Sequence, residues 1–166
     1  MGTSCRFIAD SMLGTLARRL RMLGIDTPYL RDADDSELIY LVRSQCGVLL
    51  TRDTGLAREL NDRAWFVTGR DVREEFLSIA PAIAAAGCHT APMTRCLSCN
   101  DLLTPVKGEP ARAKVPPHIL EKGVPLVSCP SCGKIYWKGT HAGRMKREIE
   151  WMEQQLKNAS EVSSGV

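Results

Sequence analysis

The stretch Gly47-Val48-Leu49-Leu50-Thr51-Arg52-Asp53 decides the fold of this chain. Its apolar run shows no polar alternation, which is typical of a short strand buried on both faces of a sheet. The run ends abruptly in polar residues, and the segment 54–60 that follows has the pattern of a helix. This combination indicates an α/β protein, in which ligand sites lie outside the carboxyl ends of the strands.

The residues on either side repeat the alternation of strand and helix. Strands are expected at 6–9, 26–30, 47–53 and 65–67, and Pro28 favours an edge position for the second. Helices are expected at 13–23, from Asp34 or Asp35 onward, at 54–60, and at 72–86 with Pro81 as a candidate break. Such a series predicts a mostly parallel sheet flanked by helices, and a strand order of 2-1-3-4 would make the first and third strands neighbours.

Composition excludes several classes of protein. The chain has 166 residues, a net charge of +3 and seven cysteines. No apolar run approaches the length of about 20 residues that a membrane span needs, and residues 1–6 lack the features of a signal peptide. We therefore expect a soluble, cytoplasmic protein with no membrane partner.

Acidic residues follow the expected strands at the same edge of the sheet. Asp10 and Asp53 each come directly after a buried strand, Asp35 (or Asp34) follows the second strand, and Asp71 is a weaker fourth candidate. Clustered carboxylates repel one another, so the arrangement favours a bound magnesium or manganese ion. Such an ion can activate water and neutralise charge on a phosphodiester. The alternative is that each aspartate caps a helix, and a capping box alone would explain Asp35.

The chain resembles the PIN-like ribonuclease domain known as the Mut-seven C-terminal family. The similarity spans about residues 6–150 and includes the cysteine pairs described below. It rests on an ordered series of motifs: Phe7-Ile8-Ala9-Asp10, Met12-Leu13-Gly14, Leu16-Ala17-Arg18, Leu20-Arg21, Leu23-Gly24, Asp26, Asp35-Ser36-Glu37-Leu38, Leu49-Leu50-Thr51-Arg52-Asp53, Tyr136-Trp137, Gly139-Thr140-His141 and Met145. The resemblance implies a PIN-like fold, metal-dependent RNA cleavage, and an acidic site at Asp10, Asp35 and Asp53. The chain has no clear fourth acid to complete a PIN quartet.

Two cysteine pairs are the strongest motif in the chain. Cys96 and Cys99 form one C-x-x-C unit, and Cys129 and Cys132 form the other. Four thiolates supplied in this way suit a tetrahedral structural zinc ion with no open position for catalysis. Redox-active or free thiols are the alternative. The three remaining cysteines are expected to stand alone, as in a reducing compartment: Cys5, Cys46 and Cys88.

Basic residues near these motifs are candidate contacts to RNA phosphates. Arg18 and Arg21 lie on the first helix, Arg52 precedes Asp53, and a final helix at 142–157 begins with a basic run. A solvated helix face is the alternative. Tyr136 and Trp137 could stack on bases, although packing is their more ordinary role. The candidate RNA contacts are Arg18, Arg21, Arg52, His141, Arg144, Lys146 and Arg147.

The motifs divide the chain into parts with different expected roles. A nuclease domain is expected at 1–86, a linker at 87–95, a zinc ribbon with a final helix at 96–157, and a disordered tail at 158–166. The predicted function is a magnesium- or manganese-dependent ribonuclease whose zinc ribbon assists RNA binding. The alternative is a non-catalytic RNA- or ribosome-binding adaptor in which the acidic cluster is degenerate.

Overall fold

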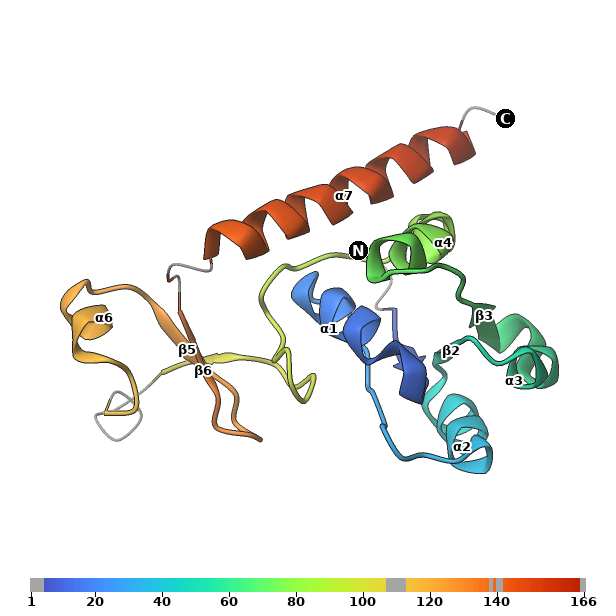
Figure 1. Ribbon diagram of the computed structural model, residues 1–166, viewed down its shortest axis with the longest axis horizontal. Helices are drawn as coiled ribbons and strands as arrows, with labels where there is room; N and C mark the ends of the chain where they lie inside the picture. The colour runs from blue at the N-terminus through green and yellow to red at the C-terminus, as the bar shows by residue number, and fades with distance from the viewer. Residues whose placement is uncertain (1–4, 107–112, 138, 140–141, 165–166) are drawn as a thin grey trace.

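A parallel sheet and a small antiparallel sheet lie toward opposite ends of the molecule, and a long final helix starts near the antiparallel sheet and extends over the helices of the parallel sheet (Figure 1). The computed structural model describes residues 5–106, 113–137, 139 and 142–164. The strands of the first sheet are β1 (Phe7–Ala9), β2 (Val48–Thr51) and β3 (Ala64–Phe66), in that order and parallel. The mixed α/β fold predicted from the sequence is confirmed.

The segment predicted as the second strand lies on the free side of β1, so the 2-1-3-4 order is confirmed. It pairs with β1 only through isolated bridges, from Arg6 to Asp26 and from Ala9 to Tyr29, so the prediction of a continuous strand was wrong. Pro28 explains this. The carbonyls of Asp26 and Pro28 accept from β1, so Pro28 is the residue whose N–H would donate back to β1, and proline has no N–H. The N–H of Thr27 lies on the opposite side of the segment and donates to the side chain of Asn100.

Helices cover both faces of the parallel sheet, as the unbroken apolar run of β2 requires. Phe7, Ala9 and Leu50 face one core together with helices α1 and α4, while Ile8 and Leu49 face a second core with α2 and α3. The helices are α1 (Gly14–Met22), α2 (Asp35–Gln45), α3 (Thr54–Leu60) and α4 (Val72–Ala85), with 3-10 turns η1 (Ser11–Leu13) and η2 (Asn61–Arg63).

Pro81 lies inside α4 without ending it. A proline removes the hydrogen bond to the carbonyl four residues earlier, here that of Leu77. Both Pro81 and Leu77 are exposed, so this carbonyl lies on the solvent side of the helix. Water can therefore replace the missing donor.

The second sheet contains β4 (Thr104–Pro105), β5 (Leu126–Ser128) and β6 (Ile135–Trp137), all antiparallel, and α6 (Pro117–Glu121) precedes β5. The final helix, α7 (Ala142–Ser164), packs along α4, and Met152 is fully buried between them. The helix continues to Ser164, so a disordered tail from residue 158 was wrong for 158–164. A helix already stabilised by packing can extend at little further cost.

The segment 87–95, predicted as a linker, is attached to the first domain. Ala91 N–H donates to the carbonyl of Leu23 at 2.8 Å, and Met93 N–H donates to that of Met22 at 3.0 Å. A disulfide joins Cys5 to Cys88, so the prediction that these two cysteines stand alone was wrong. Both corrections have one cause, which is that the chain after α4 runs back along α1 and beside the start of β1. No helix in the described ranges is both long and apolar enough to cross a membrane.

Candidate functional site

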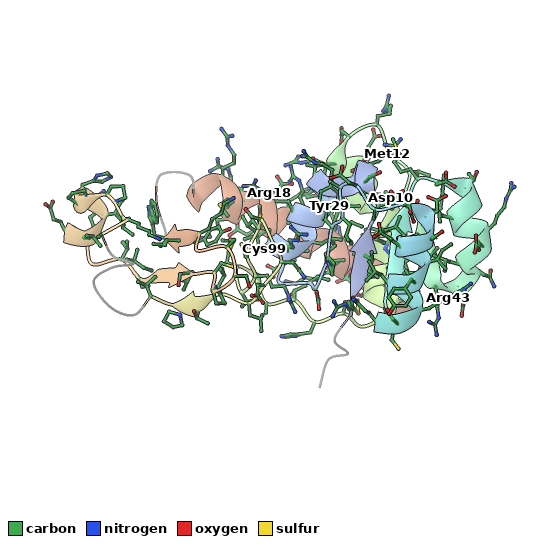
Figure 2. All side chains as sticks on the ribbon, turned by 90° about the horizontal axis from the view of Figure 1, so that it is seen from below. Asp10, Met12, Arg18, Tyr29, Arg43 and Cys99 are labelled. Carbon is green, nitrogen blue, oxygen red and sulfur yellow. A yellow bond between two sulfur atoms is a disulfide. The ribbon has the colours of Figure 1, made fainter. Side chains whose placement is uncertain are left out.

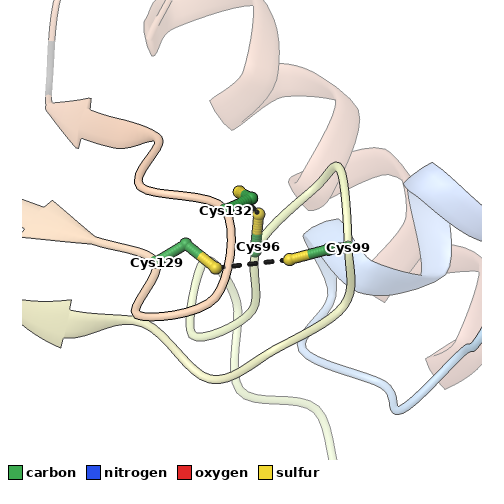
Figure 3. A group of neighbouring side chains, drawn as sticks. All are labelled: Cys96, Cys99, Cys129 and Cys132. Carbon is green, nitrogen blue, oxygen red and sulfur yellow. Dashed lines mark hydrogen bonds between the residues drawn. The ribbon is translucent and has the colours of Figure 1, made fainter.

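The four predicted zinc ligands converge (Figure 3). Their Sγ atoms all lie within 4.8 Å of one another, with Cys96 at 3.5 Å from Cys132 and Cys99 at 3.3 Å from Cys129. Two buried and two exposed cysteines alternate in the set, so the protein encloses the centre from one side. Four thiolates at this spacing fit a tetrahedral zinc ion, as the sequence predicted.

The environment of Cys96 favours its thiolate. Burial works against ionisation, but hydrogen bonds from the Tyr136 hydroxyl, at 3.1 Å, and from the N–H groups of Cys99 and Ser98 lower the pKa of Cys96 to about 6. Burial raises the pKa of Cys99 to about 12. Tyr136 is thus packed against the sulfur cluster, which supports the packing role over base stacking.

Asp10 lies at the carboxyl end of β1 and is nearly buried, with 8% of its surface exposed (Figure 2). One of its carboxylate oxygens, Oδ1, accepts from the N–H and hydroxyl of Ser11. The other, Oδ2, accepts from the Thr51 hydroxyl at 2.7 Å. All these donors are neutral.

Thr51 connects Asp10 to Asp53. Its Oγ1, besides donating to Asp10, accepts from the N–H of Asp53 at 2.9 Å. Ala9 pairs with Leu50 in the sheet, so Asp10 and Thr51 come next to each other at the strand ends, as the predicted topology required. Thr51 is fully buried, and sequence reasoning missed its role. The signal was available, because a polar residue ends an otherwise apolar buried strand.

Asp53 also caps α3. Its Oδ1 accepts from the N–H groups of Gly55, at 2.6 Å, and Leu56, at 2.9 Å. Within the described residues its Oδ2 has no hydrogen-bond or ion-pair partner. One oxygen of this carboxylate is therefore committed to the helix, and the other is available to a ligand.

The remaining aspartates of the predicted cluster share no hydrogen bond with this pair within the described residues. Asp34 forms the capping box of α2 with Glu37, and Asp35 is exposed in the first turn of the same helix. Asp71 caps α4, where hydrogen bonds from the N–H groups of Glu74 and Arg73 lower its pKa. Among described residues, only the four cysteines form a group of three or more potential ligands close enough to hold one ion.

The buried acid at the start of α4 is Glu75, not Asp71. Glu75 is 8% exposed, and its Oε1 lies 3.2 Å from a guanidinium nitrogen of Arg52. The chain directly before Asp53 is thus fastened to α4. In contrast, Asp10, Asp35 and Asp53 take part in no ion pair within the described residues.

The sequence also matches the model of a known protein family. The model of the Mut7-C RNAse domain matches residues 5–149, a range that includes the aspartate edge and all four cysteines. The chain belongs to the Mut7-C RNAse domain family. Searches of curated proteins and of solved structures gave no significant match. The family supports a ribonuclease-like domain with RNA as its substrate.

The arginines of this Mut7-C domain have unequal roles. Arg18 is exposed on α1 (Figure 2), whereas Arg21, three residues later, is 4% exposed. The Arg21 guanidinium donates to the carbonyls of Thr27 at 2.8 Å and Ser98 at 2.9 Å, and burial lowers its pKa. The proposed contact of Arg21 with RNA does not fit this placement, because its charged group is used inside the protein.

The start of α7 presents exposed cations beside α1. Arg144, Lys146 and Arg147 are exposed, and Lys146 pairs with Glu150 at 3.6 Å on the same helix. Glu148, in the same turn, forms ion pairs with Arg19 of α1 and with Arg73 of α4. These pairs fix the basic run against the Mut7-C core. His141 lies outside the described residues.

Proposed function

We propose that this protein is a ribonuclease that uses magnesium or manganese at the edge formed by Asp10 and Asp53, with Asp35 as a further acid. The observation that carries the proposal is the environment of the Asp10 carboxylate. Its carboxylate is nearly buried, yet its partners are neutral donors, and no cationic side chain in the described residues pairs with it. A buried charge without a counter-charge is unfavourable. A bound cation would supply that charge.

The donor set agrees with this metal. Carboxylate oxygens and a hydroxyl are hard ligands, which suit magnesium or manganese rather than zinc. When bound there, such an ion would supply an activated water and neutralise charge on the scissile phosphate. Thr51 holds the Asp10 carboxylate in place, and the unpaired Oδ2 of Asp53 faces no competing donor in the described residues.

Positive charge on nearby helices supports RNA as the substrate. Arg18 on α1 and the exposed run at the start of α7 belong to helices joined by the Arg19–Glu148 ion pair. Phosphate contacts of this type position a strand without reading its sequence. We propose that this surface, together with the zinc ribbon, holds the RNA while the aspartate edge cleaves it.

The second candidate, a non-catalytic RNA-binding adaptor, is favoured by one observation. Asp53 and Asp71 cap helices, and the described aspartates do not converge on a single point. In an adaptor, RNA would bind without any dependence on divalent metal.

Cleavage of a panel of structured and unstructured RNAs, with and without manganese, tests the proposal. Asp10→Asn should abolish cleavage, whereas the control Asp34→Asn should retain it, because asparagine caps a helix about as well as aspartate. Manganese-dependent cleavage by the wild type that Asp10→Asn loses supports the nuclease. Metal-independent RNA binding with no cleavage by the wild type supports the adaptor instead.

A further inference from the structure

The two cysteine knuckles have the same backbone but different residues at one position. Asn100 follows Cys99 and Gly133 follows Cys132, with φ angles of +76° and +70°. Their N–H groups donate to the carbonyls of Cys96, at 2.9 Å, and of Cys129, at 3.0 Å. Glycine adopts such a φ most readily and asparagine tolerates it. The backbone alone therefore does not explain why the first knuckle has a side chain here.

The side chain of Asn100 joins the knuckle to the nuclease domain. Its Nδ2 donates to Asp26 Oδ1 at 2.6 Å, and its Oδ1 accepts from the N–H of Thr27 at 2.9 Å. Asn100 is 8% exposed and Thr27 is fully buried, so the bond between them is shielded from water, whereas the bond to Asp26 is partly buried. Gly133 is exposed, and no atom lies within 4 Å of the place where its Cβ would be.

Other contacts strengthen the same junction. Arg95 and Arg6 lie 3.6 Å and 3.5 Å from Oδ2 of Asp26. Arg21 links the carbonyls of Thr27 and Ser98 from the interior. The first knuckle and the segment 26–29 thus satisfy one another's buried polar groups.

That segment in turn supports the loop that carries Asp10. The carbonyl of Asp26 accepts from the N–H of Phe7 at 2.8 Å, and the carbonyl of Pro28 accepts from Ala9 at 2.9 Å. The Tyr29 hydroxyl donates to the carbonyl of Ser11 at 2.9 Å.

Tyr29 also packs closely on the start of α1. A Cβ on Gly14 would lie 2.8 Å from the Tyr29 ring, so only glycine lets the ring approach this far. The contacts of Tyr29 therefore hold the turn that follows Asp10 on both sides, at Ser11 and at Gly14.

We propose that Asn100 is a positioning residue through which the zinc-folded first knuckle fixes segment 26–29, and with it the orientation of Asp10. A zinc ion at the four cysteines would then stabilise the orientation of Asp10 without being part of the nuclease site. The effect on cleavage rests on the proposed function, whereas the effect on the fold does not.

The variant Asn100→Gly tests this cleanly. Glycine suits the left-handed φ, so the variant should keep the knuckle and one zinc ion while losing both side-chain bonds. Gly133→Asn, which adds an asparagine at the matching position of the other knuckle, is the control. Elemental analysis should show one zinc ion in the wild type and in both variants.

Amide hydrogen exchange gives the decisive readout. In Asn100→Gly, and in wild type stripped of zinc, exchange should quicken at Thr27, Phe7 and Ala9, and at Leu13, whose N–H donates to the carbonyl of Asp10. Gly133→Asn should keep wild-type protection. Unchanged protection of these amides in Asn100→Gly would overturn the proposal.

Manganese-dependent RNA cleavage provides a second, independent test. Asn100→Gly should raise the manganese concentration for half-maximal cleavage about two- to thirtyfold, the range expected for a coupled network, and an unchanged midpoint would overturn the link to the nuclease site. If the wild type shows no manganese-dependent cleavage, the proposed function fails. Exchange at Leu13 then decides the positioning role alone.

Discussion

The cysteine site and the aspartate edge show two ways of assembling ligands. The four sulfurs converge to within 4.8 Å, and two short turns place them there. Strand order brings the aspartates to one edge of the sheet. Each carboxylate also accepts hydrogen bonds from nearby backbone N–H groups, because Asp10 accepts from Ser11 and Asp53 caps α3. Local spacing thus fixes the positions of the thiols, whereas strand order brings the carboxylates near each other without fixing their direction.

The largest expected effect follows from removing a zinc ligand, which should disrupt the cysteine site and leave the sheet that carries the aspartates intact. Cys129→Ser removes one of four zinc ligands, and structural zinc contributes on the order of 10 kcal/mol to the folding of small metal domains. The variant should lose its zinc ion and the ordered ribbon around β5 and β6, while the parallel sheet persists. Elemental analysis and amide exchange measure this, with the exposed Cys46→Ser as control. A wild type without zinc, or an intact ribbon in Cys129→Ser, would contradict the prediction.

The next effect concerns the aspartate edge. Asp10→Asn and Asp53→Asn should abolish cleavage, yet without metal their melting temperatures should equal or exceed that of the wild type, because an unpaired charge is removed. Manganese at about 100 times its Kd should stabilise the wild type by about 2.7 kcal/mol and the variants less. Melting curves with and without manganese, run beside the cleavage assay, measure both. Full activity in Asp53→Asn is the outcome that would reject the site.

Thr51 offers a smaller and more specific test. Thr51→Val keeps the shape but leaves Oδ2 of Asp10 and the N–H of Asp53 without their shared partner, which should cost about 1–3 kcal/mol in unfolding free energy. Thr51→Ser keeps the hydroxyl and should stay close to wild type. Urea denaturation compares them. A loss of stability in Thr51→Ser with wild-type stability in Thr51→Val would mean that the methyl group, rather than the hydroxyl, carries the effect.

The same contrast explains what the sequence could predict. The apolar run before Thr51 predicted a buried central strand, and the paired cysteines predicted their own cluster, because both signals are local. The strand at 26–30 was only partly right, since Pro28 has no N–H to donate back to β1, and the N–H of Thr27 on the other side of the segment donates to Asn100, a residue distant in sequence. Arg21 appeared to be a surface cation for a similar reason: the carbonyls of Leu97 and Ser98 that bury it come from the knuckle. The disulfide from Cys5 to Cys88 likewise depends on the return path of residues 87–95.

The smallest expected effect concerns the exposed cations of α1 and α7, which we propose contact RNA phosphates. Neutralising Arg18, Arg144 or Arg147 to glutamine should weaken RNA binding and flatten its salt dependence by about 0.7 log units per lost contact on a single strand. The fold should be unaffected, because these side chains are exposed. Arg43→Gln, which removes an exposed charge near the carboxyl end of α2 and outside the proposed contacts, is the matched control. Binding measured over a series of salt concentrations distinguishes phosphate contacts from a merely solvated face, since a solvated face predicts the wild-type slope in every variant.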